Sequence, residues 1–222
     1  MPPLLESLRG DGFENYAALF TDARLKRAAQ SSLLSALLVA MAAPVFALLA
    51  AQALRRSGRA RWLMSLVLLP LFIPGVAMGV ATALFFQLIG LKPSLFAIVV
   101  VQSLWALPFA FLIIVTAMAS FDQVYLESAH MSGAGPLRAF FEIELPLIRQ
   151  GLLGAALFSF ILSFNETIRT SLVQGGQNTI ATYIWAQFRQ VGLAPNLYAL
   201  MTILILTTLA LLIALVLIER RS

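Results

Sequence analysis

Five long apolar stretches dominate this chain of 222 residues and limit what it can fold into. A helix needs about 20 mostly apolar residues to cross the hydrocarbon core of a bilayer. Each stretch has that length, and the stretches cover residues 28–54, 62–89, 95–119, 147–172 and 197–218. Hydrophobic residues make up 60% of the chain and charged residues only 11%, whereas a soluble domain carries about 25% charged residues. The sequence therefore predicts an all-α integral membrane protein with five transmembrane helices.

Basic residues between the stretches predict the orientation of the spans. The link 55–61 reads RRSGRAR and carries four arginines, which is typical of a cytoplasmic loop. Alternation across the membrane then places the other connections, outside at 90–94 and 173–196, and inside at 120–149 and in the C-terminal tail.

The same orientation leaves a polar segment, residues 1–27, ahead of a membrane domain that extends over 28–222. Alternation places that segment outside, although Arg24, Lys26 and Arg27 would favour the inside. Either a further span precedes the first residue, or a segment of this length crosses the membrane.

Prolines interrupt the apolar stretches and predict bends in the spans. Pro44, Pro70, Pro74 and Pro108 each remove a backbone hydrogen bond and can kink a helix. Bent spans suit a transporter that opens and closes, although prolines are also ordinary in membrane helices. The glycines at both ends of the run 75–79 have the spacing that allows close helix contact, within one subunit or between two.

The outer segment 173–196 predicts a helix of its own. A pair of glycines indicates a turn near its start, and Asn178 or Thr179 can cap a helix over 180–191 that ends at Gly192. The aromatic residues of this helix are typical of the membrane interface.

The cytoplasmic segment 120–149 is too patterned for a disordered connection and predicts a helix, a turn and a second helix. Residues 124–131 form the first helix. Gly133 and Gly135 permit a tight turn, because glycine adopts positive φ at little cost. Pro136 can begin the next helix at its first position.

Seven residues of this segment keep a fixed spacing. An acidic residue and two small residues are followed by three further residues and a glycine. Nine more residues then separate this glycine from Ile-x-Leu-Pro. The seven residues are Glu127, Ser128, Ala129, Gly133, Ile143, Leu145 and Pro146. The pattern resembles the cytoplasmic signature of the inner-membrane permease subunits of binding-protein-dependent ATP-binding-cassette (ABC) importers, with Ser128 in place of the family's first alanine.

The resemblance implies how this segment works. In such importers the short helix docks in a groove of the ATP-binding subunit and transmits closure of the ATPase pair to the spans. Ser128 and Ala129 would then form a small face for close approach, and Glu127 would pair with a donor on the partner. Gly133 would set the angle between the helices, and Pro146 would begin the fourth span. The alternative is an amphipathic surface hairpin that has no partner.

The resemblance extends over most of the chain and is closest to the polyamine-type (spermidine/putrescine-like) branch. The fourth stretch contains Ser163-Phe164-Asn165-Glu166, where that branch has a Ser-Phe-Asp-Asp-like run. The altered acidic pair leaves permeases for iron, phosphonate or another anion as alternatives, and a non-transport membrane assembly protein as a further one. Members of the family usually have six spans, so the first span is expected to be missing here.

Polar residues near the outer end of the fourth stretch are candidates for the solute route. Glu166 and Arg169 stand three positions apart and can pair on one face of a helix. Ionisable groups at membrane depth usually face a pathway or a protein neighbour. Asn165, Glu166 and Arg169 therefore either line the outer mouth of a pathway or steady a helix end. Trp105 in the third stretch either lines the route or packs between helices.

The sequence carries no nucleotide-binding or catalytic motif of its own. It contains no Gly-x-x-x-x-Gly-Lys run, a single histidine and no cysteine, so we expect neither an enzyme nor a metal or cofactor site on this chain. ATP would be bound by a partner. The expected role is part of the pathway for a small solute in the bacterial cytoplasmic (inner) membrane. The expected partners are a pair of ATP-binding subunits, a sibling permease subunit (a heterodimer rather than a homodimer), an extracytoplasmic solute-binding protein and membrane lipids, but no nucleic acid.

Overall fold

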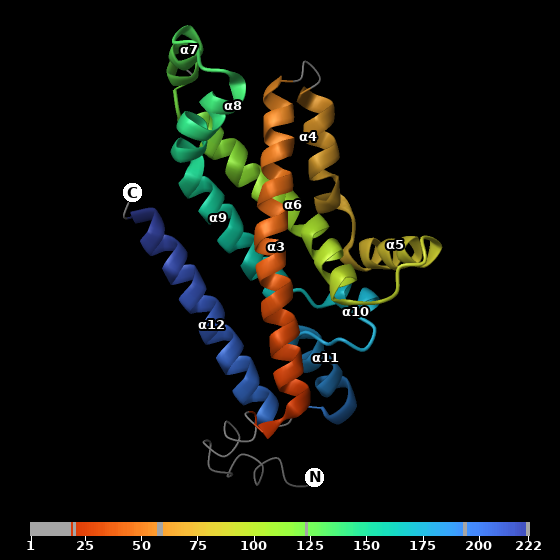
Figure 1. Cartoon of the computed structure of the whole chain (residues 1–222). Helices are drawn as coiled ribbons and strands as arrows, with labels where there is room; N and C mark the ends of the chain where they lie inside the picture. Colours follow the sequence, from red (N-terminus) through yellow and green to blue (C-terminus); the bar gives the residue numbers. More distant parts are fainter. Residues whose placement is uncertain (1–18, 20, 57–59, 123, 193–194, 221–222) are drawn as a thin grey trace.

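The computed structural model describes residues 19, 21–56, 60–122, 124–192 and 195–220. Every regular element in this part of the chain is a helix (Figure 1), which confirms the expected all-α class. Most of the polar segment 1–27 and the middle of the arginine-rich loop 55–61 lie outside the described residues.

Three long helices form the centre of the structure, α3 (Ala23–Arg56), α6 (Leu95–Ser120) and α9 (Leu145–Phe164), and each packs against the other two (Figure 1). The buried positions of α3 carry mainly small side chains, which let helix backbones approach closely in a bilayer. On α3 the residues that are at most 2% exposed are Ala28, Ser32, Ser35, Ala36, Val39, Ala43, Ala47 and Ala51. Large apolar side chains on the other side of α3 are exposed, which suits contact with lipid.

The second apolar stretch is broken rather than straight. It forms α4 (Ala60–Leu68), a 3₁₀ turn (Leu69–Phe72) and α5 (Gly75–Leu88), with a bend of 104° between the two arms. Pro70 and Pro74 account for the break, because neither has an N–H to donate and the residue before Pro74 is extended. The kink predicted at these prolines is therefore confirmed, but it is sharp enough that α5 leaves the bundle sideways (Figure 1).

The fourth stretch ends earlier than predicted. α9 stops at Phe164, and after a short break the chain forms α10 (Ile168–Val173). The side chain of Asn165 donates a hydrogen bond to a carbonyl in the last turn of α9, at 2.9 Å. The Glu166 carboxylate accepts one from the backbone N–H of Arg169, also at 2.9 Å, and so satisfies a free donor at the start of α10. One continuous span to residue 172 was therefore the wrong expectation, because these polar residues end one helix and begin another.

The segment predicted to form an outer helix does so. α11 (Ile180–Val191) begins with a capping box between Thr179 and Thr182 and ends at Gly192, whose φ is 83°. The Ser32 hydroxyl accepts a hydrogen bond from the first N–H of the helix at 2.7 Å. This bond attaches α11 to α3.

The last helix, α12 (Pro195–Arg220), packs against α9 and α11. Among the described residues, α3, α6 and the helix that ends in α9 are long and apolar enough to cross a membrane, and α4 with α5 adds a fourth if the bent pair is one span. By the same measure α12 offers a shorter apolar stretch, Leu197–Ala210. The predicted number of five spans is therefore not confirmed.

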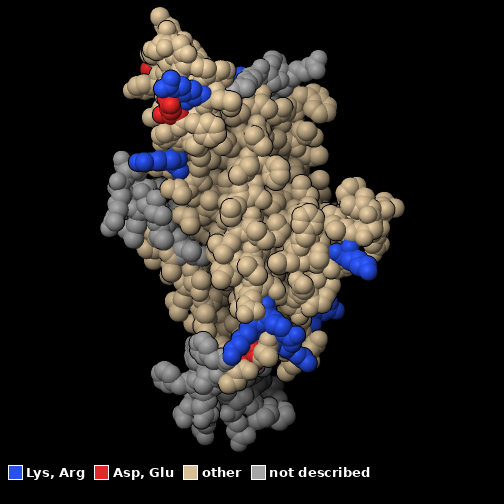
Figure 2. Space-filling model, in the orientation of Figure 1, with Lys and Arg blue, Asp and Glu red and all other residues tan. Residues whose placement is uncertain are grey.

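Connections predicted to share a side of the membrane lie at the same end of the structure. The end of α3 and the segment 120–149 lie at one end, and the start of α3 lies with α11 at the other (Figure 1). A methyl group on Gly175 would lie 2.7 Å from Pro93 Cβ, so the two predicted outer connections touch. Figure 2 shows the acidic and basic side chains of one face gathered toward the two ends, with a wide band of other residues between them.

Candidate functional site

The segment that carries the spaced motif forms the predicted helix, turn and helix. α7 (Val124–Met131) ends in a Schellman turn, in which the Ala134 N–H donates to Ala129 O at 2.9 Å and the Gly133 N–H donates to His130 O at 3.0 Å. The φ of Gly133 is 84°, a left-handed conformation that costs a residue with a Cβ about 1–2 kcal/mol. Gly133 therefore sets the direction in which the chain leaves α7.

The second helix of the hairpin continues into a membrane helix. α8 (Pro136–Ala139) leads through a π-helical turn (Phe140–Glu144) into α9, which begins at Leu145, one residue before the predicted start at Pro146. In a regular α-helix Pro146 could not donate to the carbonyl four residues earlier, and its ring would clash with it. The wider π turn before the proline relieves this conflict, and such turns are frequent at functional sites.

The predicted coupling residues differ in exposure, and Ala129 is the one that is buried. Glu127 and Ser128 face solvent on α7. Ala129 is only 7% exposed, because it packs inside the hairpin, so Ser128 alone supplies the small surface expected from the pair. In the second helix, Ile143 and Leu145 are half-buried and Pro146 is exposed.

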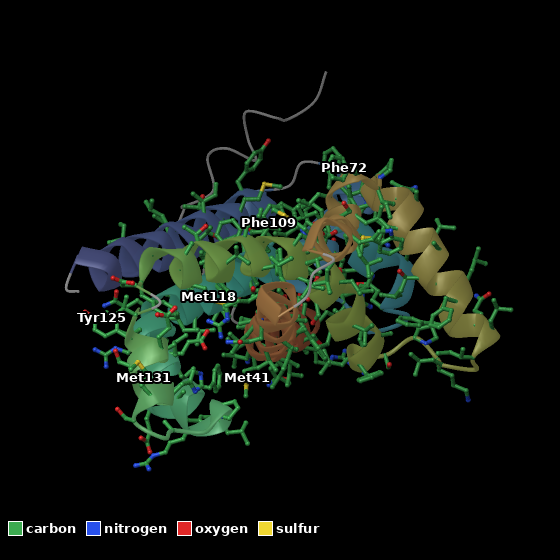
Figure 3. All side chains as sticks on the ribbon, turned by 90° about the horizontal axis from the view of Figure 1, so that it is seen from above. Met41, Phe72, Phe109, Met118, Tyr125 and Met131 are labelled. Carbon is green, nitrogen blue, oxygen red and sulfur yellow. The ribbon has the colours of Figure 1, made fainter. Side chains whose placement is uncertain are left out.

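The hairpin also exposes large apolar side chains. Figure 3 shows Tyr125 and Met131 pointing away from the bundle. The docking face, as we call it, consists of Val124, Tyr125, Met131, Leu137 and Phe141, which are between 56% and 90% exposed. Contiguous exposed apolar residues mark a contact with another protein or with a membrane. Spacing along the sequence could not separate this surface from an inward-facing stripe, because both follow the period of a helix.

A buried carboxylate lies at the base of the hairpin. Glu144 is 1% exposed. Its Oε1 accepts a hydrogen bond from Gln52 Nε2 at 2.6 Å, and its Oε2 accepts one from Arg55 Nη2 at 2.7 Å. Arg55 Nη2 also donates to Gln52 Oε1 at 2.8 Å, so that the three side chains form a closed set, the Gln52–Arg55–Glu144 network. No local sequence pattern predicts this network, because α3 and the π turn are about 90 residues apart.

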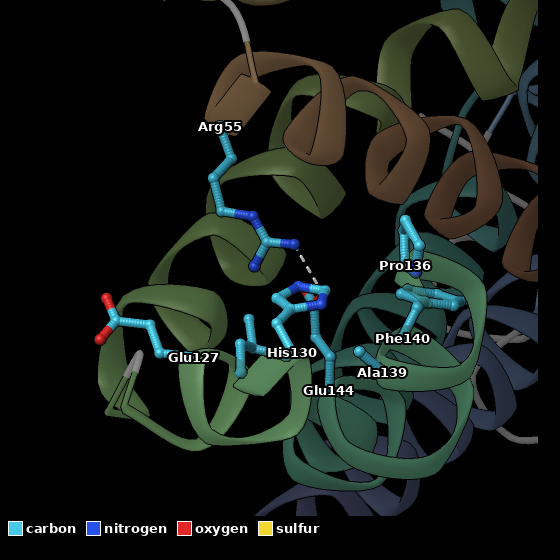
Figure 4. A pocket seen from close by; sticks show the side chains of 8 residues that line it. Arg55, Glu127, His130, Pro136, Ala139, Phe140 and Glu144 are labelled. Atoms are coloured by element: carbon cyan, nitrogen blue, oxygen red, sulfur yellow. Dashed lines mark hydrogen bonds and ion pairs between the residues drawn. The ribbon is translucent and has the colours of Figure 1, made fainter. Parts of the chain in front are cut away.

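A pocket of about 370 Å³ lies beside this network. The hairpin over 124–146 and the end of α3 form its wall (Figure 4). The lining residues are Arg55, Leu126, Glu127, His130, Pro136, Ala139, Phe140 and Glu144. The Glu127 carboxylate points away from the Arg55–Glu144 pair, toward the outside of the hairpin (Figure 4).

A second polar cluster lies in the break between α9 and α10. Glu166 and Arg169 are 8% and 7% exposed, and Arg169 Nη1 donates to Glu166 Oε2 at 2.7 Å. The Arg169 Cζ lies 3.8 Å from the centroid of the Trp105 ring. The structure thus brings together three of the predicted pathway residues as an internal ion pair beside an aromatic ring. Asn165 is not part of the cluster, because it is exposed and bonds to its own helix.

The glycines of the run 75–79 make the close helix contact that their spacing predicts, and they make it within this subunit. A methyl group on Gly75 would lie 3.1 Å from the Arg169 guanidinium carbon. A methyl group on Gly79 would lie 2.6 Å from Leu172 Cδ1 and 3.2 Å from Arg169 Cα. The sideways helix α5 therefore lies directly on α10 and covers the ion pair.

The match to a family model shows what this arrangement belongs to. Residues 17–221 match the binding-protein-dependent transport system inner membrane component. The chain belongs to this family. It is a permease subunit of an ABC importer for a small solute and a multi-pass protein of the bacterial inner membrane, as its motif and its apolar stretches predicted.

Curated relatives of this permease subunit are polyamine permeases. It is 28% identical to the spermidine/putrescine transport system permease protein PotC of Escherichia coli K12 over 208 residues. The aligned region covers 92% of this chain and 78% of the relative. It is 27% identical over 218 residues to PotC of Haemophilus influenzae, with 97% and 85% covered. The putrescine transport system permease protein PotI of E. coli K12 is 27% identical over 200 residues, with 86% and 71% covered. The predicted resemblance to the polyamine-type branch is confirmed.

Solved ABC transporters share the fold of the permease subunit. A chain of the MetNI methionine ABC transporter in an inward-facing conformation superposes with a TM-score of 0.75 at 19% identity, over 89% of this chain and 95% of that one. A chain of an amino acid ABC transporter superposes with a TM-score of 0.71 at 17% identity, over 100% of both chains. The arrangement of helices is therefore that of ABC transporter membrane subunits.

Proposed function

We propose that the hairpin over 124–146 is the surface through which this permease subunit binds its ATP-binding subunit and receives the movement that ATP hydrolysis drives. The docking face carries the proposal, because five large apolar side chains stand exposed at the end of the molecule that holds the predicted cytoplasmic loops. Glu127 stands beside them with its carboxylate directed outward (Figure 4), and a basic or donor group of the partner would pair with it. The chain itself would hold no ATP, which stays with the partner.

The hairpin is built to transmit movement. Gly133 fixes the turn after α7, and from Pro136 onward the chain runs as one helix to residue 164. A push on α7 would therefore reach the membrane through a continuous helix and not through a loose linker. This rigidity supports a coupling role over a surface hairpin with no partner.

The experiment compares two glycines in the same backbone state. Gly133 and Gly90 have φ values of 84° and 74°, and neither has an atom within 4 Å of an added Cβ. Both Gly133→Ala and Gly90→Ala therefore cost about 1–2 kcal/mol of local strain, but only the first disturbs the hairpin. We expect Gly133→Ala to reduce co-purification of the ATP-binding subunit, and Gly90→Ala to leave it unchanged. Equal co-purification in both variants would contradict the proposal.

We further propose that the transported solute is a polyamine-class organic cation, delivered by an extracytoplasmic binding protein. The likeness to spermidine/putrescine and putrescine permeases supports this assignment. In this proposal the subunit pairs with a different, sibling permease, and the break between α9 and α10 faces the route between them. Asn165 is exposed at this break, whereas Glu166 and Arg169 are buried there, with Arg169 against the ring of Trp105.

A neutral or anionic solute is the second candidate, and one observation favours it. The carboxylate of Glu166 is already compensated by Arg169 at 2.7 Å, so it offers no free negative charge to a cation. Uptake of radiolabelled spermidine and putrescine by cells that express the complete importer separates the candidates. A polyamine importer takes up radiolabelled spermidine or putrescine, whereas uptake of both at the level of cells without the importer would favour the second candidate.

A further inference from the structure

We propose that the Gln52–Arg55–Glu144 network is a second connection between the coupling hairpin and the membrane bundle, which carries movement of the hairpin into α3. The inference rests on the proposed coupling role of the hairpin. It gives three residues outside the known motif positions a positioning role in transport.

The geometry of Glu144 supports such a role. Its side chain is 2% exposed, and both carboxylate oxygens are occupied by donors from α3 at 2.6 and 2.7 Å. A buried carboxylate that loses its partner is strongly unfavourable, because its charge is then uncompensated in a medium of low polarity. A change in the position of the π turn relative to α3 therefore has to break this contact or to take Arg55 and Gln52 along with it.

The network joins the hairpin directly to α3, in addition to the packing of α3 against α9, the helix into which the hairpin continues. α7 packs chiefly against α8 and the π turn, whereas the main packing partners of α3 are α4, α6, α9 and α11. The network thus gives the part of the hairpin before α9 a polar contact with α3 that does not depend on α9. α3 then runs from this end of the molecule to α11 at the other, where Ser32 holds the first N–H of α11. A movement passed to α3 can thus reach the outer end without passing through α9.

The π turn is the element that places Glu144 in this position. It adds one residue to the helical turn before Pro146, and the side chains that precede it are rotated relative to α9. Glu144 is the last residue of this turn and points toward α3, while Phe141 in the same turn is 60% exposed on the docking face. One short segment thus contacts the proposed ATPase partner on one side and α3 on the other.

A purely structural ion pair is the competing explanation, and neutralising both charges separates the two. Arg55→Met alone leaves the buried Glu144 carboxylate without its charged partner and destabilises the complex. The double variant Arg55→Met/Glu144→Gln removes both charges, so that no uncompensated charge is left in the interior, and it should be more stable than Arg55→Met alone. Its control is Arg149→Met, on an exposed arginine of α9 that lies outside the hairpin.

The test uses the complete importer in proteoliposomes and measures three quantities. These are thermal stability, co-purification of the ATP-binding subunit, and the ratio of ATPase activity with and without the solute-loaded binding protein. We expect the double variant to keep its ATPase partner and to be more stable than Arg55→Met alone, while the stimulation ratio falls about fivefold or more. The control should keep all three quantities.

Two results would overturn the inference. One is a double variant whose stimulation ratio equals that of the control, which would make the network structural only. The other is a double variant that loses the ATP-binding subunit, which would show that the network serves docking and not transmission. The docking proposal is tested separately, by comparing co-purification of the ATP-binding subunit between wild type and Gly133→Ala.

Discussion

Replacing Arg169 with methionine tests the buried ion pair at the break between α9 and α10. The substitution keeps the length and apolar stem of the side chain but removes the only side-chain donor that contacts Glu166 in the described structure. Glu166 is 8% exposed and would keep one hydrogen bond, from the backbone N–H of residue 169. Breaking a buried pair by removing one partner costs about 3–5 kcal/mol. At about 1.4 kcal/mol per factor of ten, the unfolding equilibrium constant rises by about two to three and a half orders of magnitude.

The double variant Glu166→Gln/Arg169→Met isolates the charge from the other contacts. The single variants Glu166→Gln and Arg169→Met each leave one buried charge without its partner. The double variant leaves no such charge and should be more stable than Arg169→Met alone. Denaturant titration of the purified complex in detergent measures the free energy of unfolding of each variant. Arg189→Met, on an exposed arginine of α11, is the matched control. A double variant whose loss equals the sum of the single losses would refute the reasoning, because the two sites would then be independent.

Two more perturbations follow from the structure. Gly79→Ala puts a methyl group 2.6 Å from Leu172 Cδ1 and should lower stability by about 1–3 kcal/mol. Gly176→Ala adds a methyl group that meets nothing within 4 Å and should leave stability unchanged. Equal melting temperatures of the two variants would contradict the close contact. The Tyr183 hydroxyl donates to Asp22 at 2.6 Å, which lowers the pKa of Asp22, while burial raises the pKa of Tyr183 to about 12. The contact therefore contributes its full stability to the folded protein between the ordinary Asp pKa of 3.8 and the ordinary Tyr pKa of 10.0. This contribution is lost as pH falls through the lowered pKa of Asp22 or rises toward about 12, the raised pKa of Tyr183. Tyr183→Phe should lose stability at neutral pH and show a flatter pH dependence at both ends in thermal unfolding scans, and an unchanged profile would rule this out.

Elements whose geometry is fixed by nearby residues were predictable from the sequence. The helix over 124–131 and the glycine that ends it are set by local propensity and by one positive φ, and both are confirmed. The outer helix over 180–191 has a cap and a glycine stop within a few residues, and its bounds are as predicted. Membership of the permease family followed from seven residues at fixed spacing, because that spacing is specific.

Features that depend on distant contacts could not be predicted. Hydropathy reports how apolar a stretch is but not where its axis turns, so the 104° bend after α4 was expected only as a kink. The early end of α9 depends on Glu166, whose carboxylate bonds forward to the start of α10. The ion pair between Arg55 and Glu144 joins residues that are 89 positions apart, and no local pattern marks either partner.

Because the turn over 140–144 is π-helical, the spacing of the motif also determines the angle around α9 at which the hairpin is presented. Each residue of an α-helix advances about 100° around the axis, so a helix with one residue fewer in this turn would present the docking face on a different side of α9. The number of residues between Gly133 and Pro146 thus sets the direction of α7 relative to α9, independently of the side chains in between, and in our proposal this directs α7 toward the ATP-binding subunit. A deletion of one residue within 140–143 should leave the membrane helices in place while crosslinks from α7 to the ATP-binding subunit are lost. Unchanged crosslinking would show that the angle is set elsewhere.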